Sequence, residues 1–206
     1  VANIEFEYTG PQPATTWLGD PPDGKRGQNR TSIDAAIWWE DSGSIWRLTF
    51  VEFKYTERQV RGCGRYTSSG NPDRQICRTL DVLTGNPEER CYEASHSSSR
   101  TTRRYWEHLE EAGIKLDRLG KATGCPFRKP FNQVMRQFLL TAYHRKAEFG
   151  SDQVDVTVLD FDGNDSLARV PKELSTLGPD IVSAWNDALG EVPHLRKINV
   201  SQLAEE

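Results

Sequence analysis

Three polar residues in two apolar stretches have the types that metal-assisted hydrolysis uses. Asp34 follows Ile33 in the first stretch, and Glu52 and Lys54 flank Phe53 in the second. Side chains alternate along a strand, so Glu52 and Lys54 would point to one face. Carboxylates on paired strands make a hard oxygen site suited to Mg²⁺ or Mn²⁺, and a neighbouring lysine can orient water or offset negative charge. The spacing therefore predicts a metal-dependent site.

A β-hairpin would bring these residues together. Residues 32–39 and 45–55 have strand character, and they are separated by a turn with the sequence Asp41-Ser42-Gly43-Ser44. Apolar residues then recur every three or four positions from 132 to 148, which predicts a helix of about four turns with Asn132 as its N-cap. Residues 154–161 alternate and are β-branched, which indicates a strand.

The remaining elements are expected to be shorter. Residues 1–29 are rich in Pro and Gly and predict an extended segment without long regular elements. A short helix is expected over 101–110, a C-terminal helix over 174–189 and a last strand over 194–200. The length of 206 residues fits one domain, 1–206, with residues 58–125 as an insertion ahead of the long helix.

The charge of the chain is unevenly distributed. The formal net charge is -4, which argues against a protein that coats DNA generically. Between Arg58 and Arg104, however, nine Arg, no Lys and five acidic residues give +4, so the rest of the chain carries -8. Guanidinium groups can meet a phosphate with two parallel hydrogen bonds, so this block indicates phosphate recognition. A solvated loop region with scattered Arg is the alternative.

The apolar pattern predicts a soluble cytoplasmic protein with no membrane partner. No stretch reaches the roughly 20 apolar residues of a membrane span, and the first thirty residues lack the order of a secretory signal. Because the first residue is Val1 and not Met, we expect a processed chain or part of a longer one.

The pattern Asp34…Glu52-Phe53-Lys54 resembles the D…(D/E)-x-K signature of the PD-(D/E)XK nuclease superfamily. The order of hairpin, long helix and strand is similar to the superfamily's βββαβ succession, and residues 27–34 and 52–57 resemble a branch of small bacterial members. Ile33 stands where the superfamily's name has Pro. The resemblance implies an α/β fold with a mixed sheet and a restriction-endonuclease-like βββαβ core, carrying an Arg- and Cys-containing insertion.

The resemblance also implies roles for single residues. Asp34, Glu52 and the backbone carbonyl of Phe53 would bind Mg²⁺ or Mn²⁺, and Lys54 would orient water or stabilise charge. RecB-like members carry a Gln and a Tyr on the following helix. Gln133 and Gln137, four residues apart on one helix face, match that Gln here, and Gln133 is the catalytic candidate.

Two further features of the superfamily have candidate counterparts in this chain. Tyr143 is the candidate for the helix Tyr of RecB-like members. Many members add a Glu from an N-terminal helix, for which this chain shows no clear helix. Glu5, Glu7 and Asp20 are the substitutes within the sequence.

The resemblance implies a metal-dependent nuclease that cleaves phosphodiester bonds, of DNA in preference to RNA. Its partners would be nucleic acid, a larger protein complex or a second copy of the chain. The alternative is a catalytically inactive nuclease-like module that binds nucleic acid or assembles a complex. A purely structural interpretation also stands, in which Glu52 and Lys54 form a surface ladder and Asp34 faces solvent.

Four cysteines fall in or just after the Arg-rich block. Cys63, Cys77, Cys91 and Cys125 are separated by 14, 14 and 34 residues, without a C-x-x-C pair. Buried unligated thiols, a zinc or iron–sulfur site, and disulfides all remain open for these residues. A domain built around a cluster is therefore a third hypothesis.

Overall fold

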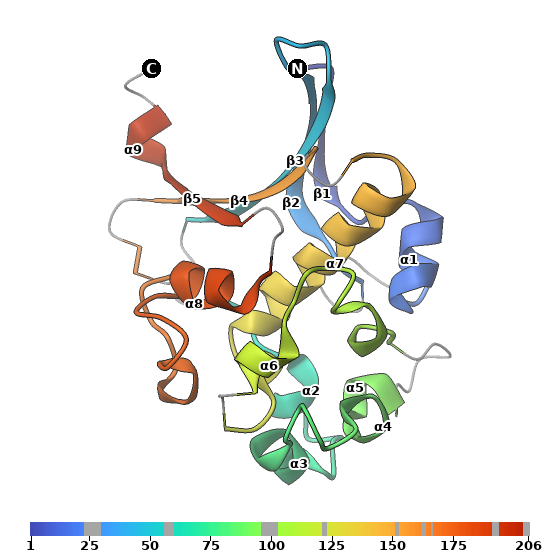
Figure 1. The fold of residues 1–206 in the computed structure, drawn as a ribbon, viewed down its shortest axis with the longest axis vertical. Coiled ribbons are helices and arrows are strands. Elements are labelled where there is room, and N and C mark those ends of the chain that lie inside the picture. The colour runs from blue at the N-terminus through green and yellow to red at the C-terminus, as the bar shows by residue number, and fades with distance from the viewer. Residues whose placement is uncertain are drawn as a thin grey trace.

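A five-stranded mixed sheet forms the centre of the computed structural model, which describes residues 1–22, 30–55, 60–95, 103–120, 123–150, 153–161, 164–165, 167–190 and 194–203. The strands lie side by side in sequence order: β1 (Asn3–Tyr8), β2 (Ile33–Glu40), β3 (Trp46–Lys54), β4 (Val154–Asp160) and β5 (Leu195–Asn199). The first three strands are antiparallel, and β3, β4 and β5 are parallel (Figure 1). The predicted mixed α/β fold is confirmed.

The long helix α7 (Phe131–Ala147) crosses one face of this sheet between β3 and β4 (Figure 1). Parallel neighbours need such a crossover, because a short turn cannot bring the chain back to the same end of the sheet. Phe138, Leu139 and Leu140 are fully buried within it. The predicted helix is therefore correct to within one residue at each end. The predicted cap is not, because Pro130 occupies the N-cap position and no side chain caps the helix.

The first twenty residues hold two regular elements, so the prediction of an extended segment is wrong there. β1 pairs antiparallel with β2, and α1 (Gln12–Leu18) packs against α7. Pro13 lies in the first turn of α1, where its missing N–H costs no hydrogen bond, and Gly19 ends the helix with a φ of 68°. Residues 23–29 of the predicted segment lie outside the described residues.

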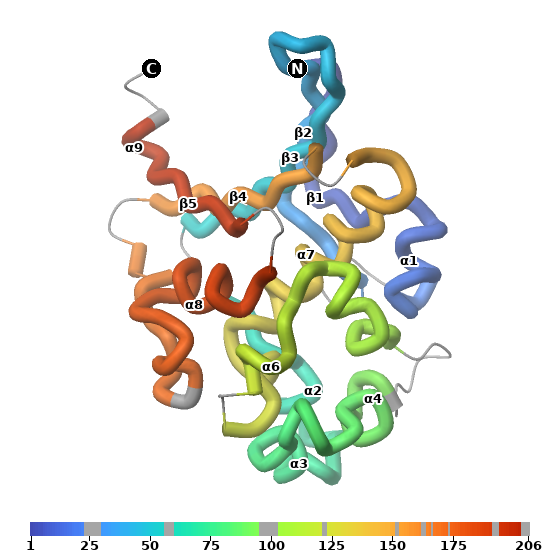
Figure 2. The backbone as a smooth tube through the Cα atoms, in the orientation of Figure 1, coloured from blue at the N-terminus to red at the C-terminus, as the bar shows by residue number. Residues whose placement is uncertain are grey.

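Short helices fill the connection between β3 and α7, which forms a lobe below the sheet (Figure 2). They are α2 (Gly64–Thr67), α3 (Arg74–Thr79), α4 (Pro87–Arg90), α5 (Tyr92–Ser95), η1 (Trp106–His108), α6 (Leu116–Leu119) and η2 (Pro126–Arg128). The helix expected over 101–110 is only the 3₁₀ turn η1 within residues 103–110, and residues 101 and 102 lie outside the described residues. The helices α2, α3 and α4 contain no fully buried residue. The packing of their own side chains therefore stabilises them only weakly.

The C-terminal part contains two separated helical segments in place of the predicted helix over 174–189. A 3₁₀ turn, η3 (Lys172–Leu174), precedes α8 (Ile181–Ala188). Pro179 and the N-cap Asp180 separate them, and the Asp180 carboxylate accepts a 2.8 Å hydrogen bond from the Ser183 N–H. The short helix α9 (Val200–Leu203) follows β5. Within the described ranges, no helix has the length and apolar character to cross a membrane.

Candidate active site

Strand pairing places the two predicted carboxylates next to each other. Ala35 of β2 pairs with Val51 of β3, which brings the adjoining Asp34 and Glu52 to the same level of the sheet. The Asp34 Oδ2 accepts a 2.7 Å hydrogen bond from the backbone N–H of Phe53. This bond fixes the Asp34 side chain against the backbone between Glu52 and Lys54.

Glu52 and Lys54 face α7 and are buried, with 4% and 1% of their surfaces exposed. The Lys54 Nζ lies 2.6 Å from the Glu52 Oε1. Burying this pair is expensive unless the remaining polar atoms are satisfied. The interpretation as a surface ladder is therefore wrong.

Two glutamines of α7 complete the environment of the Glu52 carboxylate. The Gln133 Nε2 donates to the Glu52 Oε1 at 2.5 Å, and the Gln137 Nε2 donates to the Oε2 at 2.6 Å. They reach the same carboxylate because residues four apart lie on one helix face. The Gln133 Oε1 also accepts from the Lys54 Nζ at 3.4 Å and from the backbone N–H of Arg61 at 3.2 Å. Gln133 thus links the core strand to the connection that follows it.

Other predicted residues lie elsewhere. Tyr143 packs beside Trp17 of α1, with ring centroids 5.9 Å apart. Glu5 and Glu7 are exposed on β1.

Asp20 belongs to a separate buried network. Its carboxylate accepts hydrogen bonds from the Thr31 N–H at 2.6 Å and the Tyr105 hydroxyl at 2.7 Å, and lies 3.1 Å from the Arg103 Nη1. The N-terminal helix α1, with the sequence QPATTWL, carries no acidic residue. A third carboxylate from this part of the chain is therefore not brought to Asp34 and Glu52 in the described structure.

A pocket lined by arginines adjoins the site at Gln133. Its volume is about 360 Å³, and Arg30, Arg61, Arg65 and Arg136 contribute to its wall. The Nε of Arg30 is buried without a hydrogen-bond partner among the described residues. A cavity lined by four arginines, and linked to the Glu52 carboxylate through Gln133, has the chemistry to bind a phosphodiester backbone.

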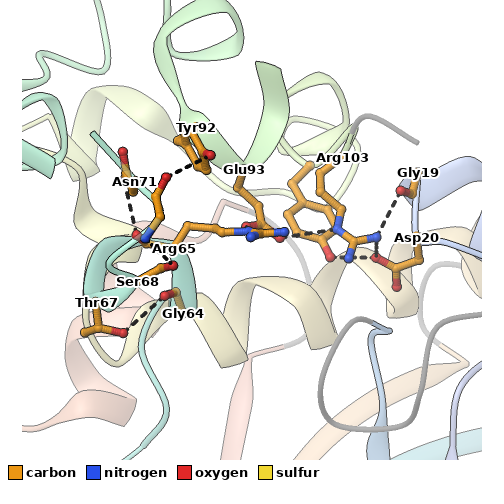
Figure 3. Close-up of polar contacts among 12 residues, drawn as sticks. Gly19, Asp20, Gly64, Arg65, Thr67, Ser68, Asn71, Tyr92, Glu93 and Arg103 are labelled. Carbon is orange, nitrogen blue, oxygen red and sulfur yellow. Dashed lines mark hydrogen bonds and ion pairs between the residues drawn. The ribbon is translucent and has the colours of Figure 1, made fainter. Parts of the chain in front are cut away.

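One of the pocket arginines, Arg65, is held by an acidic residue of the lobe. Glu93 accepts a hydrogen bond from the Arg65 Nε at 3.0 Å and another from the Arg103 Nε at 3.3 Å (Figure 3). Arg103 in turn contacts Asp20 at the end of α1. This row of alternating charges connects the lobe to α1 and keeps Arg65 at the pocket wall.

A family model matches the whole chain, residues 1–206, and is described as Restriction Endonuclease associating with ARP, REase-ARP. The chain belongs to this family. REase-ARP membership confirms, at the level of the family, the resemblance to restriction-endonuclease-like proteins. No curated protein and no solved structure matches the chain significantly.

The predicted site of this REase-ARP protein has oxygen donors of the type that Mg²⁺ prefers. No group of three or more His, Cys, Asp or Glu side chains is arranged for a metal ion within the part of the chain that the structure describes. Mg²⁺ commonly uses only one or two protein carboxylates, with waters and substrate phosphates as its other ligands. Asp34, Glu52 and the Phe53 carbonyl supply such hard oxygen donors.

The sequence does not single out the pocket arginines as a set in this REase-ARP chain. Arg61 and Arg65 belong to the predicted Arg-rich block, but Arg30 precedes β2 and Arg136 lies on α7. Arg136 is three residues beyond Gln133, so its position near the site could be expected from helix periodicity. No sequence signal connects Arg30 to the pocket, because its position depends on the contacts of its Nη2 with Gly10 and Thr15.

Proposed function

We propose that this protein is a metal-dependent nuclease of the PD-(D/E)XK type, which hydrolyses phosphodiester bonds of DNA in preference to RNA. The observation that carries the proposal is the buried Glu52 carboxylate, held by Lys54, Gln133 and Gln137 beside Asp34 on the neighbouring strand. The family description, which names a restriction endonuclease, supports the same chemistry.

Each residue of the site has a distinct task in this proposal. Asp34, Glu52 and the Phe53 carbonyl hold Mg²⁺ or Mn²⁺, which when bound supplies an acidified water and neutralises phosphate charge. Lys54 orients the attacking water and stabilises the negative charge that develops on the phosphate. Gln133 and Gln137 keep the Glu52 carboxylate in one orientation, so no reorganisation is needed during the reaction.

In this proposal the arginine pocket binds the phosphate backbone of the substrate. Arg61 and Arg65 come from the lobe, Arg30 from the segment before β2 and Arg136 from α7, so a backbone in the pocket would contact three parts of the fold. We take residues 1–206 as one nuclease domain with residues 58–125 inserted, and the insertion provides half of these arginines. In keeping with the family description, we also propose association with the partner called ARP.

Nicking of supercoiled plasmid tests the proposal directly. The wild type should nick DNA with Mg²⁺ or Mn²⁺ and not with EDTA. Asp34→Asn, which keeps the shape of the side chain, should lower the rate by roughly 100-fold or more, because a metal ligand is lost. Asp165→Asn, at an exposed position with 58% of the side chain accessible, is the matched control and should leave the rate unchanged. Equal cleavage by Asp34→Asn and wild type would refute the assignment.

The competing function is a nuclease-like module that binds DNA without cutting it. One observation favours it: both Glu52 oxygens already accept hydrogen bonds within the protein. Calorimetric titration with Mg²⁺ separates the two functions. The nuclease should bind the ion in an Asp34-dependent manner, whereas DNA binding with neither Mg²⁺ binding nor cleavage would establish the inactive module.

A further inference from the structure

The four cysteines of the chain come together in the lobe, although 14, 14 and 34 residues separate them. All four line one cavity, whose wall also includes the apolar side chains of Trp106, Phe127 and Met135. Cys63 precedes α2, Cys77 lies in α3, Cys91 lies between α4 and α5, and Cys125 precedes η2. Each thiol therefore comes from a different short element.

The backbone is shaped to bring two of these elements into contact. The Cys125 N–H donates a 2.9 Å hydrogen bond to the Cys77 carbonyl, as does the Arg128 Nη1. Gly124 has a φ of 78°, and a Cβ at this position would lie 2.4 Å from the Arg78 carbonyl oxygen. Only a glycine permits this approach without strain. The meeting of Cys77 and Cys125 is thus built into the local sequence.

A tight backbone turn follows three of the four cysteines. The backbone N–H groups of Tyr66, Ala94 and Arg128 donate to the carbonyl oxygens of Cys63, Cys91 and Cys125, at 3.2, 3.0 and 3.3 Å. In each case the donor lies three residues after the cysteine. The same local turn therefore recurs at three of the residues that line the cavity.

Four cysteine side chains around one cavity match the ligand number of a thiolate-binding metal. Four thiolates placed there without a cation would repel each other strongly. A bound cation would remove this repulsion.

We propose that Cys63, Cys77, Cys91 and Cys125 are the four ligands of one structural metal centre, a site for a thiolate-binding metal. Binding would release the four thiol protons to solvent and form four metal–sulfur bonds, with no change of oxidation state at sulfur. The centre is either a single Zn²⁺ or an iron–sulfur cluster, since both take four cysteine thiolates. The described thiols line the cavity without three of them being arranged for a single ion. Either metal would therefore require the side chains to turn towards one point of the cavity.

The lobe has a physical need for such a centre. Helices α2, α3 and α4 are four to six residues long and have no fully buried residue. Helices of this size rarely persist in water without packing, and the buried Leu80 and Val82 that follow α3 supply part of it. A metal would add a further link between these helices. The centre would also act at the pocket, because Cys63 lies between Arg61 and Arg65 and lines both cavities.

Metal analysis of the full chain tests the proposal without any reference to nuclease activity. The protein is purified without oxygen or chelators from cells supplied with iron and zinc, and its iron, zinc and acid-labile sulfide are measured. An iron content equal to the sulfide content, together with absorbance at about 400 nm, identifies an iron–sulfur cluster. One zinc per chain identifies a single Zn²⁺. Cys77→Ser and Cys125→Ser should lose the metal, whereas Thr79→Ser, an exposed position on α3, should keep it.

A thiol titration of the wild type covers the case in which the serine variants fail to fold. A mercurial reagent should release the metal in proportion to the four thiols that it modifies. Folded wild type that contains neither metal, and whose thiols react freely with an aromatic disulfide before any chelation, would overturn the proposal.

Discussion

The Glu52–Lys54 pair has both members buried, an arrangement that seldom adds stability by itself. Removing two charges from water costs several kcal/mol per ion, and the attraction between them offsets this only with good geometry and further hydrogen bonds. Gln133 and Gln137 provide those bonds here. Because apolar residues would fill the same volume at a lower cost, we interpret the pair as retained for the chemistry of the site.

A double-mutant cycle measures this cost. Lys54→Met should lower the free energy of unfolding by about 3 kcal/mol, because it leaves the Glu52 carboxylate buried without its cation. Adding Glu52→Gln should restore most of the loss, since no buried charge then remains. Urea denaturation of the two single variants and the double variant gives the coupling. Strictly additive losses would show that the pair is not coupled.

His144 on α7 makes the stability of the fold dependent on pH. It contacts the Tyr8 hydroxyl through Nε2 at 2.9 Å and Glu148 through Nδ1 at 3.0 Å. Burial lowers the pKa of its imidazole below 6.5, against a smaller opposite effect of Glu148. The unfolded chain therefore binds a proton in a pH range where the folded protein does not.

The neutral His144 imidazole contributes to the free energy of unfolding. We expect this contribution to be complete above a pH of about 6.5 and to be lost as the pH falls through the pKa of His144 in the folded protein. The free energy of unfolding of the wild type should be lower at about pH 5.5 than at about pH 7.5, by up to about 1 kcal/mol. Denaturation curves at both values measure the difference. His144→Gln should reduce it, whereas His194→Gln, at an exposed position, should not. An unchanged difference in His144→Gln would assign the effect to other groups.

At the scale of elements, the connection between β3 and α7 depends on special backbone positions more than on packed helices. Gly124 illustrates this dependence, because its positive φ and its closeness to Arg78 together exclude a side chain. Gly64, at the start of α2, has no atom within 4 Å of a Cβ placed on it. The two glycines therefore make a matched pair.

Gly124→Ala should lower the free energy of unfolding by about 1–3 kcal/mol, through backbone strain and the clash with the Arg78 carbonyl. Gly64→Ala should be neutral or slightly stabilising, because alanine favours the helix. Thermal unfolding of both variants beside the wild type makes the comparison. Equal unfolding temperatures for the two variants would contradict the role given to Gly124.

At the scale of the whole molecule, the pocket exists only because three parts of the chain meet. The lobe carries the positive charge of a protein that is acidic elsewhere, and it lies next to the end of α7 that presents Gln133 and Arg136 (Figure 1). This arrangement places four arginines in one pocket beside Gln133, which hydrogen-bonds to the Glu52 carboxylate. The positive charge of this pocket would attract a phosphate backbone to the site without making the whole surface bind DNA.

Arg65→Ala should weaken DNA binding to a similar extent for all sequences and reduce the slope of log Kd against log salt by about 1. The physical reason is the loss of one phosphate contact with its released counterion. Fluorescence anisotropy at several salt concentrations gives the slope. Arg196→Ala, on the exposed side of β5 and outside the pocket, is the control. The same slope for Arg65→Ala and wild type would place the DNA elsewhere.

Much of the element order follows from local pattern alone. The β2–β3 hairpin, α7 and β4 have period-two or period-3.6 patterns that were enough to predict them to within one or two residues. The neighbourhood of Asp34, Glu52 and Lys54 follows from these patterns, because a hairpin has only one register that buries its apolar face. The position of Gln133 and Gln137 on one face of α7 follows from their spacing of four residues.

Tertiary structure decided the rest, because long-range contacts override weak local preferences. β1 is an exposed edge strand whose pairing with β2 determines its structure. Of the helix expected over 174–189, only Ile181–Ala188 forms an α-helix, directly after Pro179 and Asp180. The sequence spacing of the four cysteines fits no metal motif, yet the fold gathers them around one cavity. Residues far apart in the chain meet only when the packing of every element between them is settled, and sequence spacing carries no record of that.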